Sequence, residues 1–112
     1  MSPQPPPHER YSADLERTVD RVRTMALTRL GAAFEPEPTR ADAVRRLAQR
    51  LADDAAALAG EPLRPLPRLA DQAVGDQLAV VGHDLAAAAL AAGRPEVLDA
   101  PAEELLALRR RL

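Results

Sequence analysis

Apolar residues recur every three or four positions along most of this 112-residue chain, and prolines or glycines interrupt the pattern at intervals. This spacing places apolar side chains on one face of an α-helix. The residue types agree with it, because the apolar set holds 24 Ala and 17 Leu but only two aromatic residues, Tyr11 and Phe34. Ala and Leu favour helices and are poor material for a sheet. We therefore predict an all-α fold.

The beginning of the chain differs from the rest. Residues 1–9 are polar and rich in proline, and we expect them to form a disordered tail. Residues 10–112 are short enough for one domain and long enough to bury a core without disulfides. We therefore predict a single helical-bundle domain over 10–112.

Two amphipathic helices are predicted in the first half of this domain. The first should run from Ser12, a plausible N-cap, to Ala33, and the prolines at 36 and 38 should stop it. The second should begin after Thr39 and end at Gly60. Because the link between them is short, a long antiparallel helical hairpin is the expected arrangement.

A proline-rich connector over residues 61–69 separates this hairpin from two further helices. Its leucines recur every third residue, so we expect an extended crossover segment with one apolar edge along the bundle. A central Ala/Gly-rich helix is predicted over 71–92, and a short C-terminal helix from Asp99 or Ala100, with Pro101 in its first turn. The predicted fold is a four-helix bundle, preferably up-and-down. A three-helix core with the last helix loosely docked is the alternative.

The central helix carries an unusual stripe of small residues beside its main apolar stripe. Gly75, Ala79, Gly82 and Ala86 follow one another at spacings of four, three and four. A glycine inside a helix costs about 1 kcal/mol relative to Ala, and close approach of another helix would offset that cost. Two interpretations remain open. The stripe packs against a helix of the same chain, or it is a contact face for a second copy or another protein.

The opposite arc of the same helix is mostly polar but is interrupted by Val80 and Leu90. His83 and Asp84 lie on this arc as well. We include Val80, His83 and Asp84 with the four stripe residues as candidate interaction residues.

Signatures of catalysis are lacking in the sequence. It has no Cys, its only serines are Ser2 and Ser12, and its five glycines never cluster into a phosphate-binding loop. Asp76 and His83 lie on one face of the central helix but about 10 Å apart along it, too far for an acid–base pair. We therefore predict no catalytic, cofactor or metal site, and a protein that is not an enzyme.

The charge balance argues against nucleic acid and membrane partners. The net charge is −2, and all 15 basic residues are Arg. The absence of Lys, Ile and Asn points to a high-GC bacterial genome. No apolar run is long enough to span a membrane and the first residues lack a signal peptide, so a cytoplasmic location is expected.

Three functional hypotheses follow from these observations. The first is a small cytoplasmic adaptor or regulator that acts through protein–protein contacts and self-associates, for example as a homodimer. The second is a DNA-binding accessory protein that uses the arginines of the second helix and the run Arg109–Arg111. The third is a bundle enzyme or ligand carrier with a site near His83 and Asp84.

Overall fold

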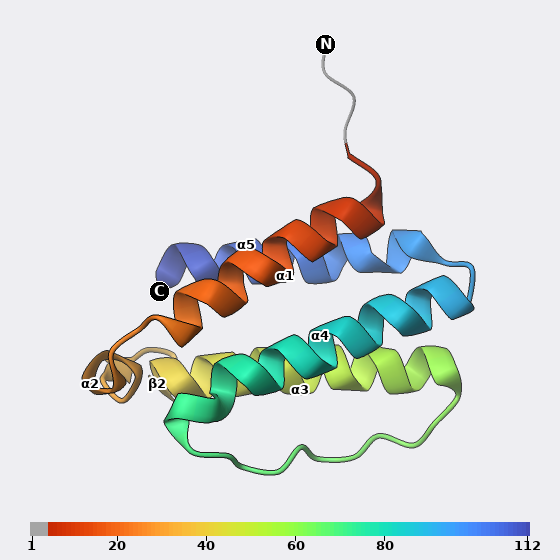
Figure 1. Ribbon diagram of the computed structural model, residues 1–112. Coiled ribbons are helices and arrows are strands. Elements are labelled where there is room, and N and C mark those ends of the chain that lie inside the picture. The colour runs from red at the N-terminus through yellow and green to blue at the C-terminus, as the bar shows by residue number, and fades with distance from the viewer. Residues whose placement is uncertain (1–4) are drawn as a thin grey trace.

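The computed structural model describes residues 5–112, and helices dominate this range (Figure 1). Four of the helices within it have more than ten residues. They are α1 (Pro7–Arg23), α3 (Arg40–Ala59), α4 (Val74–Ala91) and α5 (Asp99–Arg111). Shorter pieces are α2 (Leu27–Leu30), η1 (Asp71–Ala73) and η2 (Pro95–Leu98). The all-α prediction is therefore confirmed.

A small antiparallel hairpin was not anticipated. Strand β1 (Ala33–Phe34) pairs with β2 (Glu37–Thr39) around the predicted proline turn. Thr39 then caps α3 as expected, because its hydroxyl accepts a hydrogen bond from the backbone N–H of Asp42 at 3.1 Å. Gly60 ends α3 in a left-handed conformation with φ of 69°.

Helix α1 differs from its prediction at both ends. It begins at Pro7, inside the segment expected to be a disordered tail, because proline fits the first helical turn and Tyr11 is fully buried. Residues 1–4 of that expected tail lie outside the described residues. At the other end the helix stops at Arg23 rather than Ala33, since Thr24 bonds back to the Asp20 carbonyl and Ala26 is extended.

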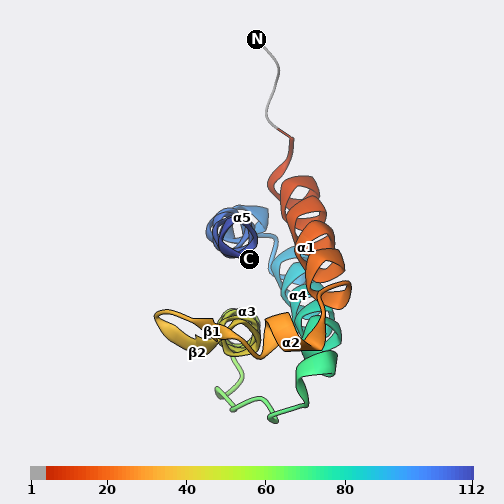
Figure 2. The same cartoon turned by 90° about the vertical axis from the view of Figure 1, so that its left-hand side faces the viewer.

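The predicted helical hairpin is wrong. Helix α1 packs on α5 and α4, and α3 packs chiefly on α4. Seen nearly end-on, the long helices follow one another in the order α5, α1, α4, α3 (Figure 2). The chain reaches this arrangement because α2 and the β-hairpin carry it away from α1 before α3 begins.

The preferred up-and-down topology is also wrong. Figure 1 shows that α3 runs parallel to α4 and that α1 runs parallel to α5. The connection between α3 and α4 is an extended crossover over residues 61–70, which we call the strap. Ten extended residues reach about 33 Å. That length covers the roughly 27 Å of an 18-residue helix, so the strap can return the chain to the start of α4.

Hydrogen bonds from the helices hold the strap in place. The Gln49 amide oxygen accepts from the Leu66 N–H at 2.8 Å, and the Gln49 amide nitrogen donates to the Arg64 carbonyl at 3.0 Å. The Gln77 amide donates to the carbonyl of Pro67 at 3.0 Å. The expected apolar edge is only partly present, because Leu66 is half-buried while Leu63 remains 63% exposed. The strap is fastened mainly through its backbone.

Helix α5 is firmly docked, contrary to the alternative of a loosely attached last helix. Its residues Ala102 and Leu105 are fully buried, and Leu108 is nearly so. Across the contact with α1, the Arg109 guanidinium donates to the carboxylate of Asp14 at 2.9 Å and to the hydroxyl of Thr18 at 3.0 Å. This polar cluster provides the carboxylate of Asp14, whose side chain is almost fully buried, with a hydrogen-bond donor and an opposite charge.

Candidate functional site: the two faces of helix α4

The inner face of α4 is the predicted small-residue stripe, and it packs against α1 within the same chain. A Cβ placed on Gly82 would lie 2.5 Å from a methyl carbon of Leu15. The hydroxyl of Tyr11 donates a 2.6 Å hydrogen bond to the Gly82 carbonyl. A Cβ on Gly75 would meet the side chains of Val22 and Arg23. A side chain at position 82 would therefore force the buried Leu15 to shift, and this close contact offsets the cost of a glycine inside the helix.

Burial of Tyr11 has an electrostatic consequence. The hydroxyl lies in the core, and this desolvation raises its pKa above the ordinary value of a tyrosine. The group stays neutral and serves as a hydrogen-bond donor between α1 and α4.

The outer face of α4 is formed by exposed residues on the side of the helix opposite its buried stripe of Val74, Leu78, Val81 and Leu85. We define it by Asp76, Val80, His83, Ala87 and Leu90. Val80 is 61% exposed and Leu90 is 74% exposed, which are high values for large apolar side chains.

The seven predicted interaction residues thus separate into distinct environments. Gly75 and Gly82 are buried against α1, and Ala79 and Ala86 are half-buried beside them. Val80, His83 and Asp84 are exposed. Sequence reasoning missed Ala87 as a member of the outer face. The signal that would have found it is the continuation of the spacing from Val80 through His83 to Leu90.

Shallow hollows flank α4 on both sides, and they separate His83 from Asp84. A groove of about 410 Å³ between α1 and α4 contains Ala79, Val80 and His83, with Glu16 and Asp20 on the α1 side. Asp84 instead lines a hollow of about 490 Å³ formed with α3 and the strap. The two side chains therefore do not converge on one site. Among residues 5–112, no group of three or more His, Asp or Glu side chains is placed to hold a metal ion.

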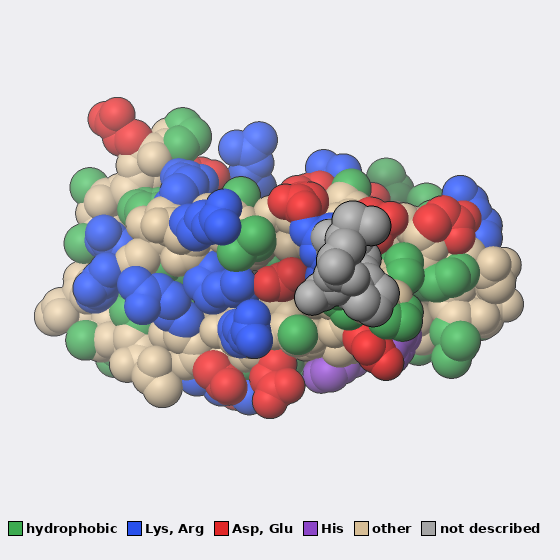
Figure 3. All heavy atoms as spheres, turned by 90° about the horizontal axis from the view of Figure 1, so that it is seen from above, with side chains coloured by type: hydrophobic (Ala, Val, Ile, Leu, Met, Phe, Trp, Pro, Cys, Tyr) green, Lys and Arg blue, Asp and Glu red, His purple; other side chains and the backbone are tan. Residues whose placement is uncertain are grey.

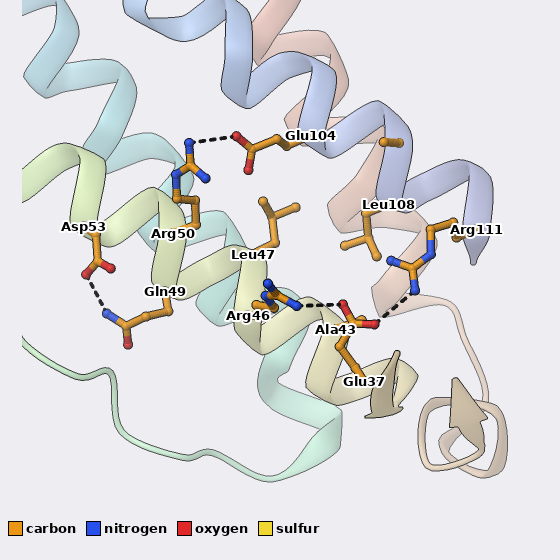
Figure 4. Close-up of a pocket in the computed structure, with 11 residues that line it drawn as sticks. Glu37, Ala43, Arg46, Leu47, Gln49, Arg50, Asp53, Glu104, Leu108 and Arg111 are labelled. Atoms are coloured by element: carbon orange, nitrogen blue, oxygen red, sulfur yellow. Dashed lines mark hydrogen bonds and ion pairs between the residues drawn. The ribbon is translucent and has the colours of Figure 1, made fainter. Parts of the chain in front are cut away.

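A larger groove, of about 660 Å³, lies between α3 and α5 and was not predicted (Figure 4). Its apolar floor includes Leu47 and Leu108, and charged side chains form its rim. The ion pair Arg50–Glu104 crosses it at 3.2 Å. No local sequence pattern indicates such a groove, because it results from the pairing of helices far apart in the chain.

Glu37 on β2 closes one end of the α3–α5 groove. Its carboxylate lies 3.0 Å from the Arg111 guanidinium and 3.8 Å from that of Arg46. The hydrogen bond from Arg111 is the main reason that the pKa of Glu37 lies below its usual value, although partial burial opposes the shift. Arg111 also stacks over the ring of Phe34, 4.5 Å from its centroid.

Most arginines proposed for DNA binding are engaged within the chain. Arg45 is paired with Asp42 and Asp71. Arg46, Arg50, Arg109 and Arg111 also form ion pairs, whereas Arg110 has none among the residues that the structure describes. For Asp42, burial opposes ionisation, but hydrogen bonds from Thr39 and Arg45 outweigh it and lower the pKa.

Most of the arginines visible on the face formed by α1 and α5 lie over one half of it (Figure 3). Arg21 and Arg23 lie in the last turn of α1, and Arg109–Arg111 lie in the last turn of α5. Because these helices are parallel, their C-terminal ends lie at the same end of the molecule (Figure 1). Cations are stabilising near helix C-termini, so the fold itself accounts for the clustering.

Comparison of the chain with family models, with curated proteins and with solved structures gives no match. Within residues 5–112, none of the helices combines the length and the apolar character needed to cross a membrane. The candidate site therefore stands on the geometry of α4 and its neighbours.

Proposed function

We propose that this chain is a small cytoplasmic adaptor or regulator that acts through protein–protein contacts, and that the outer face of α4 is its contact surface. On this proposal the fold is a four-helix bundle that is open along the side between α3 and α5. The observation that carries the proposal is the exposure of Val80 and Leu90 on the most apolar of the long helices.

The apolar character of α4 supports this choice. Residues 85–91, the last two turns of α4, have no polar side chain, and a helical segment that is apolar nearly all round is usually buried on all sides. Here α1 and α3 cover only part of its circumference, and Val80, Ala87 and Leu90 remain exposed. Burial of a Val or Leu side chain contributes about 1.5–3 kcal/mol, so a partner on this face gains substantially from covering two of them.

The other two hypotheses have less support. DNA binding would need free arginines, and those on α3 and at the end of α5 are mostly held by carboxylates. An enzyme or carrier site near His83 and Asp84 would need the two side chains to share a hollow, and each lines a different one.

Site-specific photocrosslinking tests the proposal. A photoreactive amino acid replaces Ala87 on the outer face, and a matched control replaces Ala57, an exposed alanine on α3. In the cells that naturally produce the protein, we expect crosslinked adducts from position 87 and few from position 57. Equal adduct yields at the two positions, or none at position 87, would contradict the proposal.

A further inference from the structure

The outer face of α4 borders the groove between α1 and α4, and Val80 and His83 belong to both. The α1 residues that line this groove extend from Ser12 to Arg23, which corresponds to about 17 Å or three helical turns. The apolar side chains of its lining are Leu15, Val19, Ala79 and Val80. Helices α3 and α5 both lie on the other side of the α1–α4 pair (Figure 2), and only α1 and α4 contribute the described walls of the groove.

The wall formed by α1 carries two carboxylates without ion-pair partners. Glu16 and Asp20 are exposed one helical turn apart, and neither forms an ion pair within the part of the chain that the structure describes. Like charges at this spacing destabilise a helix, so the two carboxylates do not serve the stability of α1. Arg23 supplies the one guanidinium among the described lining residues, and it is bonded to Asp76 at 2.7 Å. The groove is therefore negatively charged.

A third unpaired carboxylate lies on the opposite flank of the outer face. Asp84 is exposed beside α3 and the strap. It forms no ion pair within residues 5–112, although Arg64 lines the same hollow. Val80 and Ala87 therefore lie between carboxylates of α1 on one flank and Asp84 on the other. A complementary surface would be apolar along its middle and positively charged on both sides.

The larger groove between α3 and α5 does not have this pattern. There, Glu37 lies beside Arg111 and Arg46, and Glu104 lies beside Arg50. A charged partner would have to break these ion pairs before it could form new ones. At the outer face of α4 the flanking carboxylates are unpaired, so opposite charge is attracted without that cost. Charge complementarity thus favours the α1–α4 groove.

We propose that the occupant of the outer face of α4 is a basic amphipathic helix of another protein, seated along the α1–α4 groove. Its apolar stripe would cover Val80 and Ala87, and its lysines or arginines would lie beside the carboxylates on both flanks. This inference rests on the proposed function, since it names the partner for the same surface. Amphipathic helices commonly bind in grooves of this kind, and long cationic side chains cover apolar surface while their charged ends reach outward.

The same charges disfavour the other candidate occupants. Nucleic acid and anionic membranes carry phosphate groups, which the carboxylates of the groove repel. A second copy of this chain would have to present a basic helix with an exposed apolar stripe. Helix α5 carries Arg109–Arg111, but its Leu105 and Leu108 are buried in the core. On α3, which also carries arginines, Val44 and Leu51 are buried in the same way.

Identification of the crosslinked segment tests the chemistry of the partner. A photoreactive amino acid replaces His83, which lies both in the groove and on the outer face. Crosslinking is done in the cells that naturally produce the protein, and mass spectrometry identifies the attached peptide. We expect a segment rich in Lys or Arg with apolar residues at helical spacing. An acidic or neutral segment, a second copy of this chain, or an adduct with nucleic acid or lipid would overturn the proposal.

Reversal of the groove charges provides the second readout. The double variant Glu16→Lys with Asp20→Lys should lower the adduct yield at position 83 at least fivefold. The matched control, Glu35→Lys with Glu61→Lys, changes the net charge equally at exposed loop positions and should leave the yield unchanged. An unchanged yield in the groove variant, or an equal loss in both variants, would overturn the proposal. Circular dichroism of each purified variant checks that the fold is retained.

The two proposals fail in different ways. Adducts at position 87 that involve a segment without basic character, and that survive reversal of the groove charges, would overturn the basic-helix proposal and leave the contact surface in place. The absence of adducts at positions 83 and 87 would overturn both.

Discussion

The edge between α1 and α4 and the edge between α3 and α5 are built on opposite principles. At the first, Gly82 lets the side chain of Leu15 rest against the helix backbone, and a groove of about 410 Å³ remains beside this contact. At the second, Leu47 and Leu108 lie beneath a rim of long charged side chains, and a groove of about 660 Å³ remains. The size of the residues at a helix crossing therefore decides how closely the two helices approach, and we call the first edge closed and the second open in this sense.

The two edges should also differ in how much they contribute to stability. The closed edge buries Tyr11, Leu15 and Leu78 completely or nearly so. The open edge is bridged by ion pairs such as Arg50–Glu104, in which both side chains are partly exposed. Exposed ion pairs typically contribute between about 0 and 1 kcal/mol. Changes at the closed edge should therefore cost more.

The largest effect is expected from Gly82→Leu, which forces a side chain into the space occupied by Leu15. Overpacking costs about 1–3 kcal/mol and more when the neighbour cannot move, so we expect a loss of about 3 kcal/mol or more. Urea denaturation measures it. Gly75→Ala is the matched control, because its Cβ would meet a flexible carbon of Arg23 at 3.1 Å, and we expect a change below about 1 kcal/mol. Similar losses at the two glycines would show that Gly82 is not special.

A smaller effect is expected from Tyr11→Phe. The change removes the 2.6 Å hydrogen bond to the Gly82 carbonyl but leaves the ring in the core. A buried hydrogen bond contributes about 1 kcal/mol, so the free energy of unfolding should fall by about that amount. Thermal and urea unfolding should agree on the loss. An unchanged stability would mean that the hydroxyl does not link the two helices.

At the open edge, Glu104→Gln should have a still smaller effect. It removes the charge that bridges the groove to Arg50 but keeps the size of the side chain. We expect a loss of about 0–1 kcal/mol that disappears at high salt, because exposed pairs are screened. Unfolding in low and in high salt distinguishes this from a packing effect. A loss as large as that of Gly82→Leu would contradict the contrast between the edges.

Acid should loosen the open edge before the closed one. The pKa of Glu37 is lowered in the fold, so the stabilisation from its ionised form is complete above about pH 4, where an unfolded Glu titrates. It is lost as the pH falls through the folded pKa. Amide exchange or chemical shifts near Phe34 and Leu108 should therefore change at a higher pH than those near Tyr11. Simultaneous change at both edges would contradict this order.

Local chemistry in the sequence was sufficient to predict several helix boundaries. Thr39, Gly60 and Pro101 occupy the cap and first-turn positions expected of them, because these roles depend on neighbours within a few residues. The early end of α1 was not predicted, since the turn at Ala26 and the burial of Leu30 depend on contacts with later parts of the chain.

The pairing of helices and the candidate site were predicted only in part. The small-residue stripe indicated a close crossing but not its partner, which is α1. Val80 and His83 are on the outer face as expected, whereas the groove between α3 and α5 was missed entirely. The pairing of helices depends on how much apolar surface helices from distant parts of the chain bury against one another. The local spacing of residues within one helix does not indicate that total.

The parallel pairing of α1 with α5 has a consequence for how the chain is made. Arg109 and Asp14 are 95 residues apart, so α1 leaves the ribosome long before α5 has been synthesised. Until then, Thr18 and Asp14 lack the hydrogen bonds that Arg109 donates to them. During that interval the core-facing side of α1 lacks one of its two covering helices. Chaperone binding to nascent chains should therefore persist until α5 has emerged, and the final tertiary structure should form only after the last helix is synthesised.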